Sequence, residues 1–190
     1  GTGKTVFAQA TYDFTYLPDE QQKANAKYIY NYLTNEGWSK EAICGLLGNI
    51  EQESHLNPGA WQVGASNPGY GLIQSTPYKG YRKFLDWADL ENSDADKMAQ
   101  DDPKNLMDLQ LEYLIYSSQT STPAEVRQWF PTTNYASPYK MSYNEYIVST
   151  NDVGELALVF HGSYERSGDT VQVRENRVGY AEAWYKYFSK

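Results

Sequence analysis

Two short segments of the 190-residue chain carry side chains suited to proton transfer at a polar substrate. The first, at residues 51–54, reads EQES and closes a stretch with helical periodicity, so it places a carboxyl group at a helix end. The second, at residues 69–77, reads GYGLIQSTP and combines glycines with a polar Gln before a turn. A carboxylic acid held beside such a segment can act as a general acid.

The acid has two candidates, Glu51 and Glu53, on a helix expected at residues 40–54. The apolar face of this helix is set by four side chains: Ile43, Leu46, Leu47 and Ile50. On a helical wheel Glu53 falls beside Leu46 at one edge of that face, and Glu51 falls near Leu47 at the other. A carboxyl group half buried at a helix C-terminus has its ionised form disfavoured by desolvation and by the helix dipole. Periodicity leaves the choice between the two residues open.

Helical patterns dominate the elements that must position these groups. Helices are expected at residues 20–35 after Asp19, at 40–54 after Ser39, from Thr76-Pro77 through Trp87, at 103–118, at 123–130, from the capping box of Ser142 and Glu145, from Asn151 or Asp152 through Phe160, and at 174–188. A short strand is expected at residues 69–75, with residues 61–63 as its partner in a small β-hairpin. The polar, acidic residues 90–101 are expected to form a surface loop.

The order and spacing of several short motifs resemble the phage tail lysozyme family of peptidoglycan hydrolases. These motifs are AICGLLGN at residues 42–49 leading into Glu53-Ser54, NPG at 57–59, WQ at 61–62, GLIQ at 71–74, TP at 76–77 and SYER at 163–166. The Glu-Ser and GLIQ motifs are also similar to those of lytic transglycosylases. The resemblance implies an α+β, predominantly α-helical, lysozyme-like fold with a small β-hairpin beside the substrate cleft. Residues 18–190 would form the catalytic domain, and residues 1–17 an irregular lead-in or linker.

The resemblance assigns the general acid to Glu53, because Glu53-Ser54 matches the acid of the family and the Ser that follows it. The implied activity is that of a muramidase, which cleaves the β-1,4 bond between N-acetylmuramic acid and N-acetylglucosamine. Two other functions stay open. One is a lytic transglycosylase that gives 1,6-anhydromuramic products, and the other is a catalytically inactive module that binds glycan or has a structural role.

Four residues are expected to contact the glycan. In lysozyme-like folds the strand that carries Tyr70 and Gln74 lines the cleft, so the Gln74 amide can hold sugar N-acetyl and hydroxyl groups, and Tyr70 can stack on a ring. Tyr164 resembles the Tyr of the transglycosylase C-terminal motif, and His161 is close enough to it in sequence to face the cleft. The alternatives are structural, because Gln74 can bond the next turn and His161 can be a core residue.

The second carboxylate of a glycosidase has no obvious source in this chain. No Asp or Glu lies between Glu53 and Asp86, so the expected hairpin cannot supply it. Glu165 is the preferred base for activating water in an inverting reaction, and Asp169 and Asp86 are the other candidates. Glu165 can instead form an ion pair with Arg166. Assistance by the sugar N-acetyl group, or one Glu acting first as acid and then as base, would remove the need for a second carboxylate.

The composition argues against several classes of partner. The net charge is −8 and the pI about 4.8, whereas phosphate binding needs clustered Lys and Arg, so no nucleic-acid partner is expected. The chain has no apolar run of about eighteen residues, so no membrane span is expected. Cys44 is the single cysteine and allows no intramolecular disulfide. The two His residues are separate in sequence, and no metal or cofactor is expected.

The expected partner is the glycan strand of peptidoglycan. Because an acidic chain is not steered towards an anionic cell wall, we expect it to be tethered to other domains of a larger wall-degrading protein. The expected location is extracellular or facing the cell wall, on a virion tail or in a secreted or conjugation-associated protein.

Overall fold

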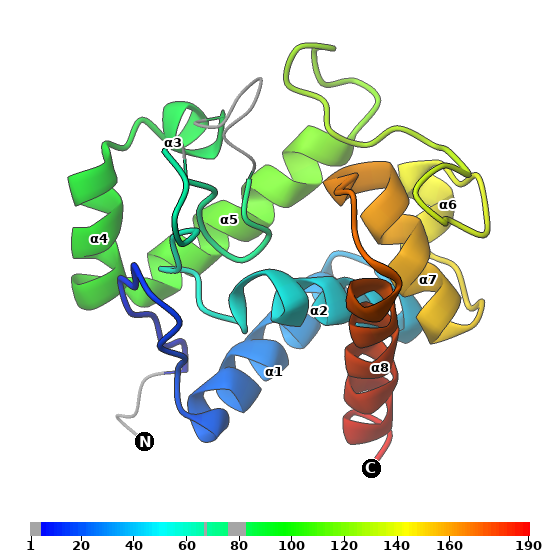
Figure 1. Cartoon of the computed structure of the whole chain (residues 1–190), viewed down its shortest axis with the longest axis horizontal. Helices are drawn as coiled ribbons and strands as arrows, with labels where there is room; N and C mark the ends of the chain where they lie inside the picture. The colour runs from blue at the N-terminus through cyan, green and yellow to red at the C-terminus, as the bar shows by residue number, and fades with distance from the viewer. Residues whose placement is uncertain (1–4, 67, 76–82) are drawn as a thin grey trace. The chain divides into compact units, whose positions relative to one another are not determined.

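The computed structural model describes residues 5–66, 68–75 and 83–190, and this part of the chain is predominantly helical. The helices are α1 (Asp19–Asn35), α2 (Lys40–Ser54), α3 (Lys83–Ala88), α4 (Asn92–Asp101), α5 (Pro103–Ser118), α6 (Tyr143–Ile147), α7 (Val153–Phe160) and α8 (Val171–Tyr187), as Figure 1 shows. A π-helical turn, η1 (His161–Glu165), directly follows α7. The predicted predominance of α-helix is confirmed.

The chain divides into two compact units, and the predicted site residues are shared between them. The first unit comprises the described parts of Gly1–Tyr28 and Glu53–Tyr116, and the second comprises Ile29–Gln52 and Ser117–Lys190. The first unit holds Glu53, Tyr70 and Gln74, and the second holds His161, Tyr164 and Glu165.

Several helices begin where their capping residues predict. In α2 the Ser39 hydroxyl accepts a hydrogen bond from the Ala42 backbone N–H at 3.1 Å, which satisfies a donor of the first turn. In α6 the Ser142 hydroxyl accepts from the Glu145 N–H, and the Glu145 carboxylate accepts from the Ser142 N–H, which completes the predicted capping box. Local hydrogen bonding at the first turn is thus sufficient to locate these boundaries.

The expected loop at residues 90–101 is wrong, because α4 occupies Asn92–Asp101. A capping box between Glu91 and Asp94 starts this helix. Ala95 and Ala99, spaced by one turn, are buried, and most of the polar residues face solvent. A high content of charge therefore indicated exposure, and exposure alone does not distinguish a surface helix from a loop.

The helix expected at residues 123–130 is also absent. A single turn forms there, in which the Val126 N–H donates to the Pro123 carbonyl at 2.9 Å, and the chain then continues without helix. Trp129 is buried, and its indole N–H donates to the Met141 carbonyl at 3.0 Å. Burial of one large side chain has overridden the local helical signal of Thr122-Pro123.

The predicted β-hairpin is not confirmed. Among the described residues, pairing is limited to isolated bridges, which are antiparallel between Trp61 and Tyr70 and between Tyr70 and Ser75. Residues 71–74 form a turn, in which Gly71 and Gln74 have positive φ angles of 83° and 49°. The expected neighbour of Tyr70 is therefore found, but the chain reverses too early for a strand. Asn67 and Thr76-Pro77 lie outside the described residues.

Each unit has its own buried aromatic cluster. In the first unit four buried aromatic rings contact one another in the order Trp61, Tyr70, Phe84 and Tyr113. In the second unit α7 and α8 pack against each other (Figure 1), and Trp129, Tyr146 and Phe160 pack edge to face or tilted within the core. Many of the aromatic side chains of the described residues therefore fill the interior of a unit.

Candidate functional site

The last turn of α2 brings the predicted acid to a fixed place in the first unit. Glu53 is partly buried, and the next residue, Ser54, is buried. The Ser54 hydroxyl donates a hydrogen bond to the Leu72 carbonyl at 2.8 Å. Residues 53–54 and 71–74, which are distant in sequence, are therefore directly connected beside Glu53.

The chain leaves α2 through two consecutive left-handed residues. His55 and Leu56 have φ angles of 50° and 66°, which end the helix directly after Ser54. Leu56 is fully buried, and its carbonyl accepts a hydrogen bond from the Asn25 side-chain amide at 2.8 Å. The Asn57 side chain then accepts from the Gly59 N–H at 2.9 Å and closes the Asn-Pro-Gly turn. These bonds hold the backbone that follows the acid.

Glu51, the other candidate acid, has a structural partner in the second unit. Its carboxylate accepts a hydrogen bond from the Trp184 indole N–H at 2.8 Å. Trp184 is a buried residue of α8. This contact indicates a packing role for Glu51, and the assignment of the acid to Glu53 stays a prediction.

Gln110 is a residue of the site that the sequence analysis missed. Its amide oxygen accepts from the Leu72 N–H at 2.8 Å, and its amide nitrogen donates to the Pro58 carbonyl at 2.7 Å. A Cβ atom at Gly71 would lie 2.6 Å from the same oxygen, so only glycine admits this approach. The sequence did contain one signal for Gln110: it is a neutral polar side chain on the largely apolar helix α5. A polar side chain buried on such a helix needs hydrogen-bond partners.

Gln74 and Tyr70 have structural contacts that limit their access to a substrate. The Gln74 amide nitrogen donates to the carbonyls of Ala60 at 2.8 Å and of Gly71 at 2.9 Å, as the structural alternative expected. Tyr70 is buried, with its ring centroid 4.2 Å from that of Trp61. Contact of Gln74 and Tyr70 with the glycan stays a prediction.

The SYER motif forms a π-helical turn in the second unit. The Arg166 N–H donates to the His161 carbonyl five residues earlier, and Arg166 has a φ angle of 51°. Its guanidinium donates to the Ser163 carbonyl at 2.7 Å and lies over the Phe130 ring at 4.9 Å. Arg166 therefore stabilises this turn through backbone carbonyls, and its expected ion pair with Glu165 stays a prediction. Such turns occur frequently at functional sites.

Tyr164 and Glu165 lie on this π-helical turn. Tyr164 is buried, its hydroxyl is 2.7 Å from the Ser117 hydroxyl, and its ring stacks on Phe160 at 5.1 Å. Glu165 is partly exposed, with one carboxyl oxygen buried. Because both residues belong to the second unit and Glu53 to the first, their cooperation with the acid stays a prediction.

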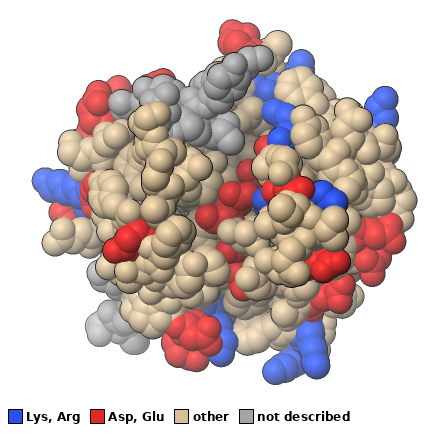
Figure 2. Space-filling model, in the orientation of Figure 1, with Lys and Arg blue, Asp and Glu red and all other residues tan. Residues whose placement is uncertain are grey.

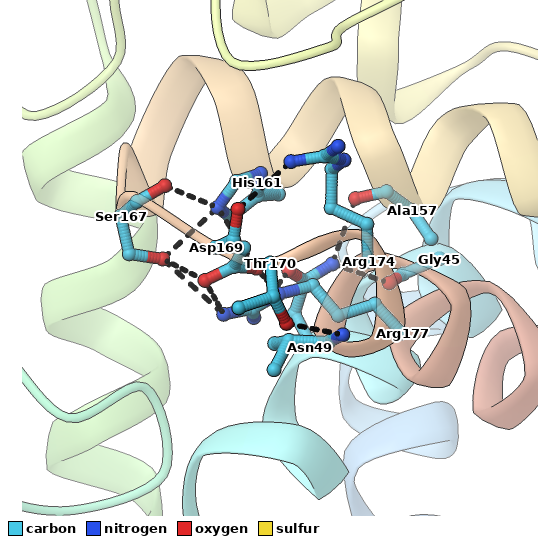
Figure 3. A network of polar contacts seen from close by, with 10 residues as sticks. Gly45, Asn49, Ala157, His161, Ser167, Asp169, Thr170, Arg174 and Arg177 are labelled. Carbon is cyan, nitrogen blue, oxygen red and sulfur yellow. Dashed lines mark hydrogen bonds and ion pairs between the residues drawn. The ribbon is translucent and has the colours of Figure 1, made fainter.

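His161 belongs to a buried polar network, shown in Figure 3. Only 1% of His161 is exposed, and its Nε2 atom lies 2.9 Å from the Ser167 hydroxyl and 3.2 Å from the Asp169 carboxylate. The Arg177 Nε atom donates to the same Asp169 oxygen at 2.6 Å, and Arg177 also donates to the Asn49 side chain at 2.9 Å. His161 is therefore a core residue, as its structural alternative expected, and the network links η1 to α8 and α2 through Asp169 and Arg177.

The charges of this network are set by burial and by Arg177. Burial, with the nearby Arg177 charge, lowers the pKa of His161 below its usual 6.5. Burial would raise the pKa of Asp169, but its hydrogen bond and ion pair with Arg177 lower that pKa overall. At neutral pH we therefore expect neutral His161 beside ionised Asp169. Asp169 is then a poor choice as a catalytic base.

The charged side chains and the groove between α7 and α8 add no residue to the predicted site. On the face drawn in Figure 2, Lys and Arg side chains of the described residues are scattered among Asp and Glu. A groove of about 450 Å³ between α7 and α8 is lined by none of the predicted site residues. Within the described residues, no helix is long and apolar enough to cross a membrane, and no group of three or more His, Cys, Asp or Glu is placed to hold a metal ion.

Comparison with known proteins places the chain in a family. Residues 24–188 match the phage tail lysozyme family, and the chain belongs to that family. It is 37% identical over 174 residues to Morphogenesis protein 1 of Bacillus phage B103. That alignment covers 90% of this chain but 41% of the phage protein, so the chain spans less than half the length of this relative.

Proposed function

We propose that the chain cleaves the β-1,4 bond between N-acetylmuramic acid and N-acetylglucosamine, with Glu53 as the general acid. Membership of the phage tail lysozyme family supports a lysozyme-like action on peptidoglycan. The observation that carries the assignment is the Ser54 hydrogen bond to Leu72 at 2.8 Å, because it joins the Glu-Ser motif to the GLIQ turn. The backbone at Glu53 is thereby held next to a segment that can hold sugar.

In the proposed reaction the Glu53 carboxyl group protonates the glycosidic oxygen as the bond to the leaving sugar breaks. Charge develops on the ring carbon, and water attacks it from the opposite face. Glu165 is the proposed base for that water, because Asp169 is held in an ion pair with Arg177. An inverting reaction needs the two carboxyl groups about 6.5–9.5 Å apart, and it leaves a reducing N-acetylmuramic acid end with inverted configuration.

Polar groups around the GLIQ turn are the proposed contacts for the glycan. Gln74 would present its amide oxygen, since its amide nitrogen already bonds to Ala60 and Gly71. Tyr70, Tyr164 and His161 are buried, so we propose that they act mainly by shaping the backbone that meets the sugar.

The decisive variant is Glu53→Gln, which keeps the shape of the side chain but removes the proton. We expect about a 10²-fold or greater loss of lysis of purified cell walls, with an unchanged melting temperature. Glu51→Gln is the matched control on the same helix turn and should retain most activity, with a stability cost from its bond to Trp184. Near wild-type lysis by Glu53→Gln would show that the acid is misassigned.

The transglycosylase alternative is favoured by one observation, the lack of any Asp or Glu between Glu53 and Asp86. Digestion of walls in ¹⁸O-labelled water, followed by mass spectrometry, separates the two reactions. Hydrolysis puts the label on the reducing N-acetylmuramic acid end. Unlabelled 1,6-anhydromuramic products would mean that Glu53 acts alone, first as acid and then as base.

A non-enzymatic role is the remaining alternative, because the phage relative is named only as a morphogenesis protein. A zymogram that shows no clearing would favour such a module. We further propose that the chain works within a larger protein at a virion tail or at the outside of a cell. The greater length of the relative and the net charge of −8, which gives no attraction to an anionic wall, support this proposal.

A further inference from the structure

Three aromatic side chains are exposed within five residues of the first unit, ahead of α1. Tyr12, Phe14 and Tyr16 are 61%, 74% and 51% exposed. Large apolar side chains clustered at a surface are informative, because isolated ones are common and clusters often mark a binding site. These three residues are called the lead-in surface below. They precede residue 24, where the match to the phage tail lysozyme family begins.

The backbone that carries the lead-in surface is firmly attached to the first unit. Val6, Thr11 and Leu17, which flank the three aromatic residues, are buried. The Thr11 N–H donates to the Gly59 carbonyl at 3.2 Å, and the Thr11 carbonyl accepts from the Trp61 N–H at 2.9 Å. The aromatic side chains are therefore displayed by a fixed segment, so less conformational entropy is lost when they bind a ligand.

The lead-in surface is next to the proposed acid. The Tyr16 ring stacks on the imidazole of His55, with 3.8 Å between the ring centroids and an angle of 25°. His55 follows Glu53 by two residues, and its left-handed backbone conformation ends α2. The stack therefore holds Tyr16 beside the end of the helix that bears Glu53. One face of the Tyr16 ring is used by His55, and half of the residue stays exposed.

Carboxylates accompany the aromatic rings. Asp13 accepts a hydrogen bond from the Thr15 N–H at 2.9 Å, in a turn that leaves Phe14 exposed between them. Asp96 accepts hydrogen bonds from the Tyr12 hydroxyl and, at 2.8 Å, from the Trp61 indole. These charges disfavour anionic lipid headgroups and phosphate-rich wall polymers. A neutral amino sugar suits them better, because its C–H faces can stack on rings and its hydroxyl groups can donate to carboxylates.

We propose that Phe14 and Tyr16, with His55 behind Tyr16, form a stacking surface for neutral N-acetylated sugar rings of the glycan strand. This inference rests on the proposed action on peptidoglycan. It extends the glycan contacts from the end of α2 onto residues outside the family match. Tyr12 supports the surface through its stacking on Trp61, at 5.9 Å between centroids.

The test measures binding without cleavage. The Glu53→Gln chain is titrated with the hexasaccharide of N-acetylglucosamine by calorimetry, alone and with Phe14→Ser or Tyr16→Ala added. We expect each added change to raise Kd about three- to tenfold, as the loss of one stacking contact predicts. Tyr139→Ala, which removes a 36% exposed aromatic side chain in the second unit, is the matched control and should leave Kd unchanged.

Several results would overturn the inference. Two of them concern the sugar: the Glu53→Gln chain does not bind the hexasaccharide, or it binds with the same Kd whether or not Tyr16→Ala is added. The other two replace the sugar with another partner: Phe14 is needed for binding to phosphatidylcholine vesicles, or for dimerisation, and not for binding sugar. Wall lysis by the wild-type chain is measured separately. Lysis combined with Tyr16-independent sugar binding would refute the surface and keep the hydrolase. Tyr16-dependent binding without any lysis would refute the hydrolase and keep the surface.

Discussion

The two units hold their motif residues by different means. In the first unit the segments beside Glu53 are joined by neutral amide side chains, with Asn25, Asn57 and Gln110 bonded to backbone groups. In the second unit the turn that carries Tyr164 and Glu165 is tied to α8 by the charged pair of Asp169 and Arg177. Amide bonds do not titrate and tolerate burial when both partners are present. A buried ion pair is costly to break, because the surviving charge has no partner.

The largest effect is expected from Arg177→Leu in the second unit. This change removes the charged partner of the buried Asp169 carboxylate and the donor to the buried Asn49 amide oxygen. We expect a loss of about 3–5 kcal/mol in the free energy of unfolding, measured by chemical denaturation. Lys104→Leu is the control, because it breaks the exposed pair with Asp108 and should change stability very little. A cost for Arg177→Leu no larger than that of the control would remove the contrast between the units.

A smaller effect is expected from Gly71→Ala in the first unit. Alanine at a φ of 83° is strained, and its Cβ would lie 2.6 Å from the Gln110 amide oxygen. One hydrogen bond to this oxygen and one from the amide nitrogen hold the Gln110 side chain in place. We expect a cost of about 1–3 kcal/mol, together with reduced wall lysis as the GLIQ turn shifts.

Gly64→Ala separates the two causes of that cost. Gly64 has a similar φ of 78°, but a Cβ there would meet nothing within 4 Å. The difference in unfolding free energy between the two variants therefore reports the Gln110 contact alone. Equal costs, with equal lysis, would mean that Gln110 moves aside and does not define the turn.

The smallest effect is expected from pH. Burial lowers the pKa of both His55 and His161 below 6.5, so the unfolded chain takes up protons first as the pH falls. The stability that neutral His provides is complete above pH 6.5 and decreases as the pH falls below it. Thermal unfolding from pH 7.5 to 5 should therefore show a weaker pH dependence in His161→Asn and in His55→Asn than in the wild-type chain. A pH dependence that is unchanged in both variants would show that neither histidine couples protonation to folding.

Much of the helical structure could be predicted because its signals are local. Ser39 and the pair of Ser142 and Glu145 mark helix starts through bonds within a single turn, and α2 and α6 begin there. The signals failed where a contact distant in sequence decided the outcome. Burial of Trp129 replaced a helix with a turn, and burial of Ala95 and Ala99 produced a helix in an acidic segment.

The candidate site shows the same division. Its motifs predict a role for Glu53 and the GLIQ segment, because residue type and order are properties of the sequence alone. The bond of Ser54, the two bonds of Gln110 and the stack of Tyr16 on His55 join residues from 18 to 52 positions apart, and no local pattern encodes them. Such contacts form only when packing brings distant segments together, because a buried polar group must then find whatever partner the fold supplies. Sequence therefore determined which groups can do chemistry. Tertiary structure decided which of these groups are exposed and which are buried in structural contacts.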